Sequence, residues 1–174
     1  MITEKWDILD AFGNPTGKTT IRGRAYLKTG EYHLVVHIWI VSSDGRILLQ
    51  RRSDQKRLMP GEWAATGGAA IMGEDSFTAA KRELGEELSI SSTVDTLKFF
   101  KRIRRKNSLL DIWFIQKDVD INSLKLQQSE VAEVKWVTLG EFSQMIKNGS
   151  FHNYGSEYFT CILKKLSEYK GVLV

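Results

Sequence analysis

Residues 68–90, GAAIMGEDSFTAAKRELGEELSI, concentrate glutamates in a chain whose formal net charge is +4. Within this segment, Ser76–Leu88 has helical spacing, because apolar residues recur every three or four positions and form one stripe. The residues of the stripe are Phe77, Ala80, Leu84 and Leu88. The segment therefore predicts an amphipathic helix with an acidic side whose purpose has to be explained.

Three glutamates, Glu83, Glu86 and Glu87, occupy positions i, i+3 and i+4 and therefore project from one side of the predicted helix. We expect this side to lie roughly opposite the apolar stripe, so that the stripe packs inward while the carboxylates face a cleft. Like charges at this spacing repel one another, and in the last turn they also oppose the helix dipole. Two explanations fit these residues: a solvated acidic face, or a site for a hard cation.

The spacing of the whole segment resembles the signature of a known enzyme family. Gly68, five residues, Glu74, seven residues and the run RELGEELSI (82–90) match the Nudix box, G-x5-E-x7-R-E-U-x-E-E-x-G-U, where U is aliphatic. Every fixed position agrees except Ser89, which stands where the family has glycine. That glycine would end the helix in a left-handed conformation, so serine should cost about 1 kcal/mol of strain without removing a ligand.

The resemblance covers most of residues 1–140 and points to the Nudix branch related to isopentenyl diphosphate isomerase. Three further segments support it, namely WDILDAFGNPTGKT (6–19), EYHLVVHIWIVSSDGRILLQRRSDQK (31–56) and PGEWAATGG (60–68). The fold that the resemblance implies is an α/β/α sandwich around a mixed β-sheet, that is, the α/β class.

Local patterns agree with that fold class. The opening residues 6–20 predict two strands around a Gly-Asn-Pro-Thr-Gly turn. A second hairpin is predicted around Asp44-Gly45, a favoured pair in tight turns, with strands over His33–Val41 and residues 46–50. The remaining expected elements are strands over 96–104, 110–116 and 134–137, and helices over Leu139–Lys147 and residues 155–169. Strands outnumber helices, which favours a mixed sheet with helices on its faces.

Bulk properties limit the remaining possibilities. The 174 residues contain no internal repeat, low-complexity tract or linker, so we expect one Nudix hydrolase domain over 1–174. Because Cys161 is the single cysteine, an internal disulfide is excluded, and we expect this residue in the core. The sequence shows no signal peptide and no membrane-spanning run, so we expect a cytoplasmic protein. The basic run KRIRRKN (101–107) is interpreted as a solvated hairpin end, with polyanion binding as the alternative.

The resemblance assigns roles to the box residues. Family members hydrolyse a nucleoside diphosphate linked to another moiety and use divalent cations. By resemblance, Glu83, Glu86 and Glu87 ligate Mg²⁺ or Mn²⁺, and one of them also serves as the general base. Arg82 would orient these glutamates through charge-assisted hydrogen bonds, and the carbonyl of Gly67 is a further expected ligand.

Other candidates come with alternatives. Glu74 is expected either to organise the loop before the helix or simply to stabilise the start of the helix. A distal metal ligand is expected just before the late strand, where Glu130 fits and Glu133 is the alternative.

Arg51, Arg52 and Lys56 are candidates for binding substrate phosphate. Strand alternation places Arg51 and Arg52 on opposite faces of the sheet, so only one should serve, and Arg52 is preferred. His33 and His37 share one strand face. His33 matches a metal-site histidine of the isomerases, although an ordinary sheet histidine is the preferred interpretation here.

The resemblance leaves three functions to weigh. Hydrolysis of a small-molecule diphosphate is preferred, because residues 66–70 (TGGAA) lack the cysteine and histidine of the isomerase site. An isopentenyl diphosphate isomerase-like enzyme is the first alternative, and a non-catalytic nucleotide-sensing Nudix module is the second. Nucleic acid and membranes are not expected partners. Many relatives form homodimers, but this sequence does not indicate the oligomeric state or the identity of the substrate.

Overall fold

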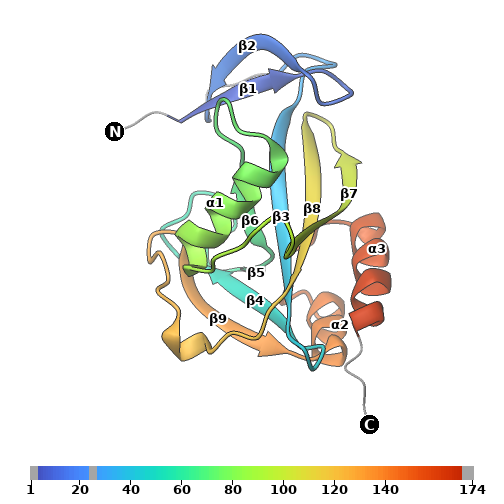
Figure 1. Cartoon of the computed structure of the whole chain (residues 1–174). Coiled ribbons are helices and arrows are strands. Elements are labelled where there is room, and N and C mark those ends of the chain that lie inside the picture. Colours follow the sequence, from blue (N-terminus) through green and yellow to red (C-terminus); the bar gives the residue numbers. More distant parts are fainter. Residues whose placement is uncertain (1–3, 24–26, 170–174) are drawn as a thin grey trace.

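A mixed β-sheet forms the centre of the computed structural model, which describes residues 4–23 and 27–169 (Figure 1). Its strands follow the order β5-β4-β3-β8-β7, with β6 paired to β3 and β9 paired to β4. The strands are β3 (His33–Val41), β4 (Ile47–Arg52), β5 (Trp63–Ala64), β6 (Thr66–Ala69), β7 (Leu97–Arg104), β8 (Ser108–Gln116) and β9 (Val131–Val137). The central strands β3 and β8 run parallel, whereas the other pairs are antiparallel.

Helices cover both faces of this sheet. Along β3, Val36, Ile38 and Ile40 pack into one core cluster with α1 (Ser76–Leu88), because alternate strand residues point to the same face. The other face carries Trp39, Val41 and their neighbours, which pack with the two C-terminal helices. These helices are α2 (Leu139–Lys147) and α3 (Ser156–Leu166), and Figure 1 shows them on the side of β8 away from α1. The expected α/β/α sandwich is therefore confirmed.

A separate hairpin of β1 (Lys5–Leu9) and β2 (Pro15–Ile21) lies beyond the start of β3 (Figure 1). Backbone hydrogen bonds between Leu9 and Tyr32 fasten this hairpin to the segment that enters β3. The hairpin places the residues around it next to the start of the central strand, where the cavity described below is found.

Most expected elements are confirmed, and the differences are local. The strand expected over 134–137 begins earlier, at Val131, because it pairs along the whole of β4. The connection between β3 and β4 is a loop over 42–46 rather than a two-residue turn, and the Asp44 side chain accepts hydrogen bonds within it. The last helix ends at Leu166 and continues as a short 3-10 turn, Ser167–Tyr169. Among residues 4–23 and 27–169, no helix has the length and apolar character needed to cross a membrane.

The two ends of α1 are fixed by side chains. Asp75 caps the first turn, because its carboxylate accepts a hydrogen bond from the backbone N–H of Thr78 at 2.7 Å. At the other end Ser89 adopts a left-handed conformation with φ 55°, as expected from the glycine that the Nudix box has there. Its hydroxyl donates to the carbonyl of Lys125 at 2.9 Å, so the serine gains a contact that glycine could not make.

This geometry predicts opposite behaviour for two substitutions of Ser89. Ser89→Ala loses the hydrogen bond and keeps the left-handed strain, so it should lower the free energy of unfolding by about 1 kcal/mol. Ser89→Gly loses the same bond but relieves the strain, so its stability should stay close to that of the unmodified chain. Urea unfolding measures both, and a fully stable Ser89→Ala variant would contradict this account.

Candidate active site

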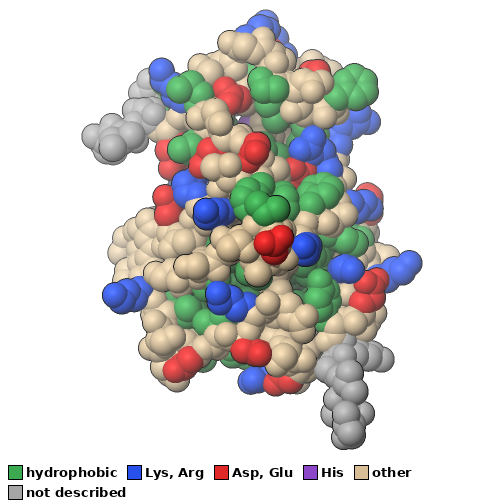
Figure 2. All heavy atoms as spheres, in the orientation of Figure 1, with side chains coloured by type: hydrophobic (Ala, Val, Ile, Leu, Met, Phe, Trp, Pro, Cys, Tyr) green, Lys and Arg blue, Asp and Glu red, His purple; other side chains and the backbone are tan. Residues whose placement is uncertain are grey.

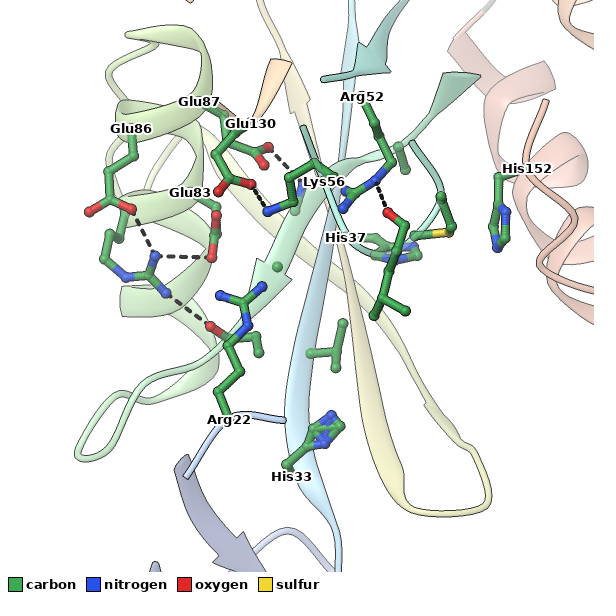
Figure 3. Close-up of a pocket in the computed structure, with 18 of the residues that line it drawn as sticks. Arg22, His33, His37, Arg52, Lys56, Glu83, Glu86, Glu87, Glu130 and His152 are labelled. Carbon is green, nitrogen blue, oxygen red and sulfur yellow. Dashed lines mark hydrogen bonds and ion pairs between the residues drawn. The ribbon is translucent and has the colours of Figure 1, made fainter. Parts of the chain in front are cut away.

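A cavity of about 470 Å³ lies between α1, β6, the start of β3 and the loop after β4. Figure 3 shows its two sides, with Glu83, Glu86 and Glu87 on α1 and with Arg52 and Lys56 facing them. An acidic wall thus faces a basic wall across one space. Such a pairing suits an anionic substrate that is bound together with cations.

The glutamates of α1 differ in their burial. Glu83 is 8% exposed and Glu87 is 2% exposed, whereas Glu86 reaches solvent. The expectation that the acidic side lies opposite the apolar stripe is therefore wrong for Glu83 and Glu87. Each directly precedes a stripe residue, Leu84 or Leu88, and so lies at the edge of the buried face, where the helix packs on β6.

Arg82 connects most of the acidic wall. Its guanidinium holds Glu74 through two hydrogen bonds of 2.8 and 3.0 Å, and it also donates to Glu83 and Glu86 at 2.9 Å each. A further bond of 3.1 Å reaches the carbonyl of Ala69 on β6. These contacts suit the orienting role predicted for Arg82. Glu74 also accepts from a backbone N–H in the preceding loop, so it organises that loop, while Asp75 caps the helix.

Among residues 4–23 and 27–169, Glu87 has only neutral hydrogen-bond donors. The amide nitrogen of Gln50 donates to it at 3.0 Å and the backbone N–H of Gly67 at 3.2 Å. Thr66 donates to the amide oxygen of Gln50 at 3.1 Å, which turns the amide nitrogen toward the carboxylate. Burial, reinforced by the nearby charge of Glu83, raises the pKa of Glu87 to about 8. Burial likewise raises the pKa of Glu83 to about 6, although Arg82 opposes that shift.

Two glycines of β6 allow this close packing. A Cβ atom on Gly68 would lie 2.4 Å from Oε1 of Glu83. A Cβ atom on Gly67, whose φ is +146°, would lie 2.0 Å from the carbonyl oxygen of Val36 on the neighbouring strand. Position 67 therefore requires glycine for steric reasons, whereas a side chain at position 68 would have to displace the carboxylate of Glu83. The role of the Gly67 carbonyl as a cation ligand stays a prediction.

The structure separates the alternatives left open by the sequence. Glu130 lines the cavity and forms an ion pair with Lys56, whereas Glu133 lies 3.6 Å from Arg51 and is absent from the cavity wall. Arg52 also lines the cavity and is 9% exposed. Arg51, by contrast, faces away from the cavity, in agreement with the strand alternation. Of the proposed phosphate-binding residues, Arg52 and Lys56 thus remain suitably placed.

Several cavity residues were missed by the sequence analysis. Trp6 and Arg22 come from the β1–β2 hairpin, and the Arg22 guanidinium points into the space between α1 and β3 (Figure 3). Arg105, from the basic run 101–107, reaches the cavity and lies 5.8 Å from the ring centroid of Tyr154. No local pattern marks these residues, because they meet only through the tertiary fold.

The rest of the basic run behaves as a hairpin end. Residues 105–107 connect β7 and β8, as expected. Within β7, Arg102 forms hydrogen bonds of 2.6 and 2.8 Å with Asp111, which is 1% exposed. This arginine thus neutralises a buried carboxylate and does not serve as a surface for a polyanion.

Both histidines of β3 line the cavity, and both lie against aromatic residues. The His33 ring stacks on Trp6 with centroids 4.3 Å apart, and burial lowers its pKa to about 4. Nδ1 of His37 lies 2.8 Å from the hydroxyl of Tyr158, and burial lowers the pKa of His37 to about 3. Cys161, expected in the core, is only partly buried beside the cluster that covers the second sheet face.

No ready-made cation cage is present within residues 4–23 and 27–169, because no three acidic, histidine or cysteine side chains converge closely enough. The side chains of this region are instead paired internally, Glu86 with Arg82 and Glu130 with Lys56. Cation binding by all of these carboxylates would therefore require rotation of the Glu86 and Glu130 side chains.

Comparisons with known proteins identify the family. Residues 31–157 match the family model of the NUDIX domain. An uncharacterized Nudix hydrolase of Listeria monocytogenes is 38% identical over 152 residues, which cover 87% of this chain and 89% of the relative. The chain therefore belongs to the Nudix hydrolase family.

Two further comparisons concern the predicted branch and the fold. The isopentenyl-diphosphate Delta-isomerase of Kocuria rhizophila is 29% identical over 140 residues, with 76% of this chain and 77% of the isomerase covered. A crystal structure from Deinococcus radiodurans shares the fold, with a TM-score of 0.74 and 19% identity over 95% of this chain and 98% of the other.

The packing of Gly68 predicts a sharp contrast between two glycine substitutions. Gly68→Ala should displace Glu83 and lower turnover by about tenfold or more, because small displacements of catalytic groups are costly. Gly85→Ala lies inside α1, where the new Cβ would have no atom within 4 Å apart from its chain neighbours and the backbone of its own helix, so it should keep activity and stabilise the helix by up to about 1 kcal/mol. Steady-state kinetics and thermal unfolding of both variants test this, and equal activities would refute the packing argument.

Proposed function

We propose that this protein hydrolyses the diphosphate bond of a nucleoside diphosphate linked to another moiety, with Mg²⁺ or Mn²⁺ as cofactor. The observation that carries the proposal is the pair of buried carboxylates, Glu83 and Glu87, which face a cavity whose other wall is basic. Family membership supports the reaction class. The choice of cofactor and substrate is inferred from the chemistry of the cavity.

The carboxylates suit a hard divalent cation. Burying an anion without a positive partner is unfavourable, and among the described residues Glu87 has only the neutral donors of Gln50 and Gly67, so its charged form is disfavoured. A cation with preference for oxygen ligands would remove that penalty. Its expected ligands are the carboxylates of Glu83, Glu86, Glu87 and Glu130 and the carbonyl of Gly67.

The other residues of the cavity would perform the remaining tasks. A bound divalent cation would offset the charge of the phosphates and acidify the attacking water. Arg52 and Lys56 would bind the diphosphate through charge-assisted hydrogen bonds, and Lys56 would exchange its pairing with Glu130 for one with phosphate. Arg82 would hold Glu83 and Glu86 in place, and one of the box glutamates would accept the proton of the water.

The alternatives have less support. Isomerase activity is suggested by the Kocuria relative, but residues 66–70, which include β6, lack the cysteine and histidine expected for it. Incubation with isopentenyl diphosphate, followed by a search for dimethylallyl diphosphate, tests that function directly. A nucleotide-sensing module would have no need of the complete set of box glutamates. On the face shown in Figure 2, basic and acidic side chains are interspersed, which does not favour nucleic acid binding there.

Replacing the carboxylates tests the proposed chemistry. Glu86→Gln and Glu87→Gln should each lower kcat by about 10²-fold or more, because the loss removes a cation ligand or a base. Glu133→Gln is a matched control, since Glu133 lies outside the cavity and pairs with Arg51. Hydrolysis is measured over nucleoside di- and triphosphates, nucleotide sugars, dinucleoside polyphosphates and isoprenoid diphosphates, with Mg²⁺ or Mn²⁺.

Circular dichroism would establish that the variants remain folded. Undiminished hydrolysis in both Glu86→Gln and Glu87→Gln, or an equal loss in Glu133→Gln, would reject the assignment of the acidic wall to catalysis. Activity that persists after removal of divalent cations with a chelator would reject the proposed cofactor.

A further inference from the structure

A second cavity, of about 620 Å³, adjoins the first on its basic side. The two cavities share the lining residues Arg22, Arg52, Lys56, Leu58 and Glu130. The second cavity extends away from α1, because none of the α1 glutamates lines it, and it gains Arg57 from the loop after β4. The shared side chains therefore place a second, more basic cavity directly beside the first.

The charges of this second cavity are unbalanced. Its lining contains four basic side chains, of Arg22, Arg52, Lys56 and Arg57, and one acidic side chain, of Glu130. Glu130 pairs with Lys56, and Arg22 pairs with a carboxylate outside the cavity, that of Glu4. Within the described residues, neither Arg52 nor Arg57 forms an ion pair.

The placement of the two unpaired arginines points to an anion. Arg52 is 9% exposed, and within the described part of the chain its side chain has only the carbonyl of Leu58 as a hydrogen-bond acceptor, at 3.2 Å. Arg57 lies over the end of the β1–β2 hairpin, with its Nη2 3.3 Å from the position of a Cβ on Gly23. A guanidinium group that has no carboxylate partner can form forked hydrogen bonds with a phosphate, which is the geometry that arginine favours.

We propose that the second cavity is an anion subsite that binds a phosphoryl group of the substrate beyond the diphosphate that is cleaved. The inference rests on the proposed function for the identity of the cleaved group. Arg52 and Lys56, on the shared wall, contact the diphosphate, and Arg57 contacts the additional phosphate. The substrate class is accordingly a diphosphate that carries a third phosphate, either in line with the first two or as a monoester on the attached moiety.

Equilibrium binding to the metal-free protein tests the subsite without requiring turnover. The probes are inorganic pyrophosphate and inorganic tripolyphosphate, measured by calorimetry on the full chain. Arg57→Gln should weaken tripolyphosphate binding about tenfold or more, the loss expected for one charge-assisted hydrogen bond, and change pyrophosphate binding less than about twofold. Arg104→Gln is the matched control, because Arg104 is exposed on β7 and lines neither cavity.

A second comparison distinguishes the two sources of the additional phosphate. NADP⁺ differs from NAD⁺ by one phosphate monoester, so a preference for NADP⁺ that disappears in Arg57→Gln indicates a monoester on the attached moiety. A preference for nucleoside triphosphate over diphosphate that disappears in the same variant indicates an in-line phosphate. Either result supports the subsite.

Three results would overturn the subsite: unchanged tripolyphosphate binding in Arg57→Gln, equal weakening of both inorganic anions in Arg57→Gln, or the same loss in Arg104→Gln. Because binding is measured without hydrolysis, these outcomes are independent of the Glu86→Gln and Glu87→Gln experiments. A failure of the subsite can thus be told apart from a failure of the proposed function.

Discussion

The sharing of one guanidinium among several carboxylates is the interaction on which the rest of the site depends. Arg82 contacts Glu74 before the helix, Glu83 and Glu86 within it, and the carbonyl of Ala69 on β6. It therefore fixes the position of α1 relative to the sheet while it balances the charge of the glutamates. Hydrogen bonds to charged groups contribute more than neutral ones, and several that meet on one planar group also impose an orientation.

The central part of the fold was predictable because its signals are local. Apolar spacing gave the limits of α1, strand alternation separated Arg52 from Arg51, and the fixed spacing of the Nudix box selected the glutamates that line the cavity. The left-handed end of the helix at Ser89 could be anticipated from the same motif.

Other features could not be predicted, because they depend on contacts between distant segments. The side-chain amide of Gln50 donates a hydrogen bond to Glu87, which lies 37 positions further along the chain. Arg22 and Arg105 enter the cavity from two separate hairpins. The burial of Glu83 was missed for a related reason. The helix pattern locates its side chain beside the apolar stripe, but only the absence of a side chain on Gly68 lets that edge pack against β6.

The pairing of Glu130 with Lys56 and of Glu86 with Arg82 has a consequence for how the protein is assembled. Each of these acidic side chains has a positive partner supplied by the chain itself. These two carboxylates therefore need no cation to balance their charge as the chain folds, unlike the ligands of small domains in which metal binding provides the folding energy. Under the proposed function, a cation that reaches the folded chain would compete with Lys56 and Arg82 for these two carboxylates, so the affinity of the site for the cation would depend partly on the strength of its own ion pairs.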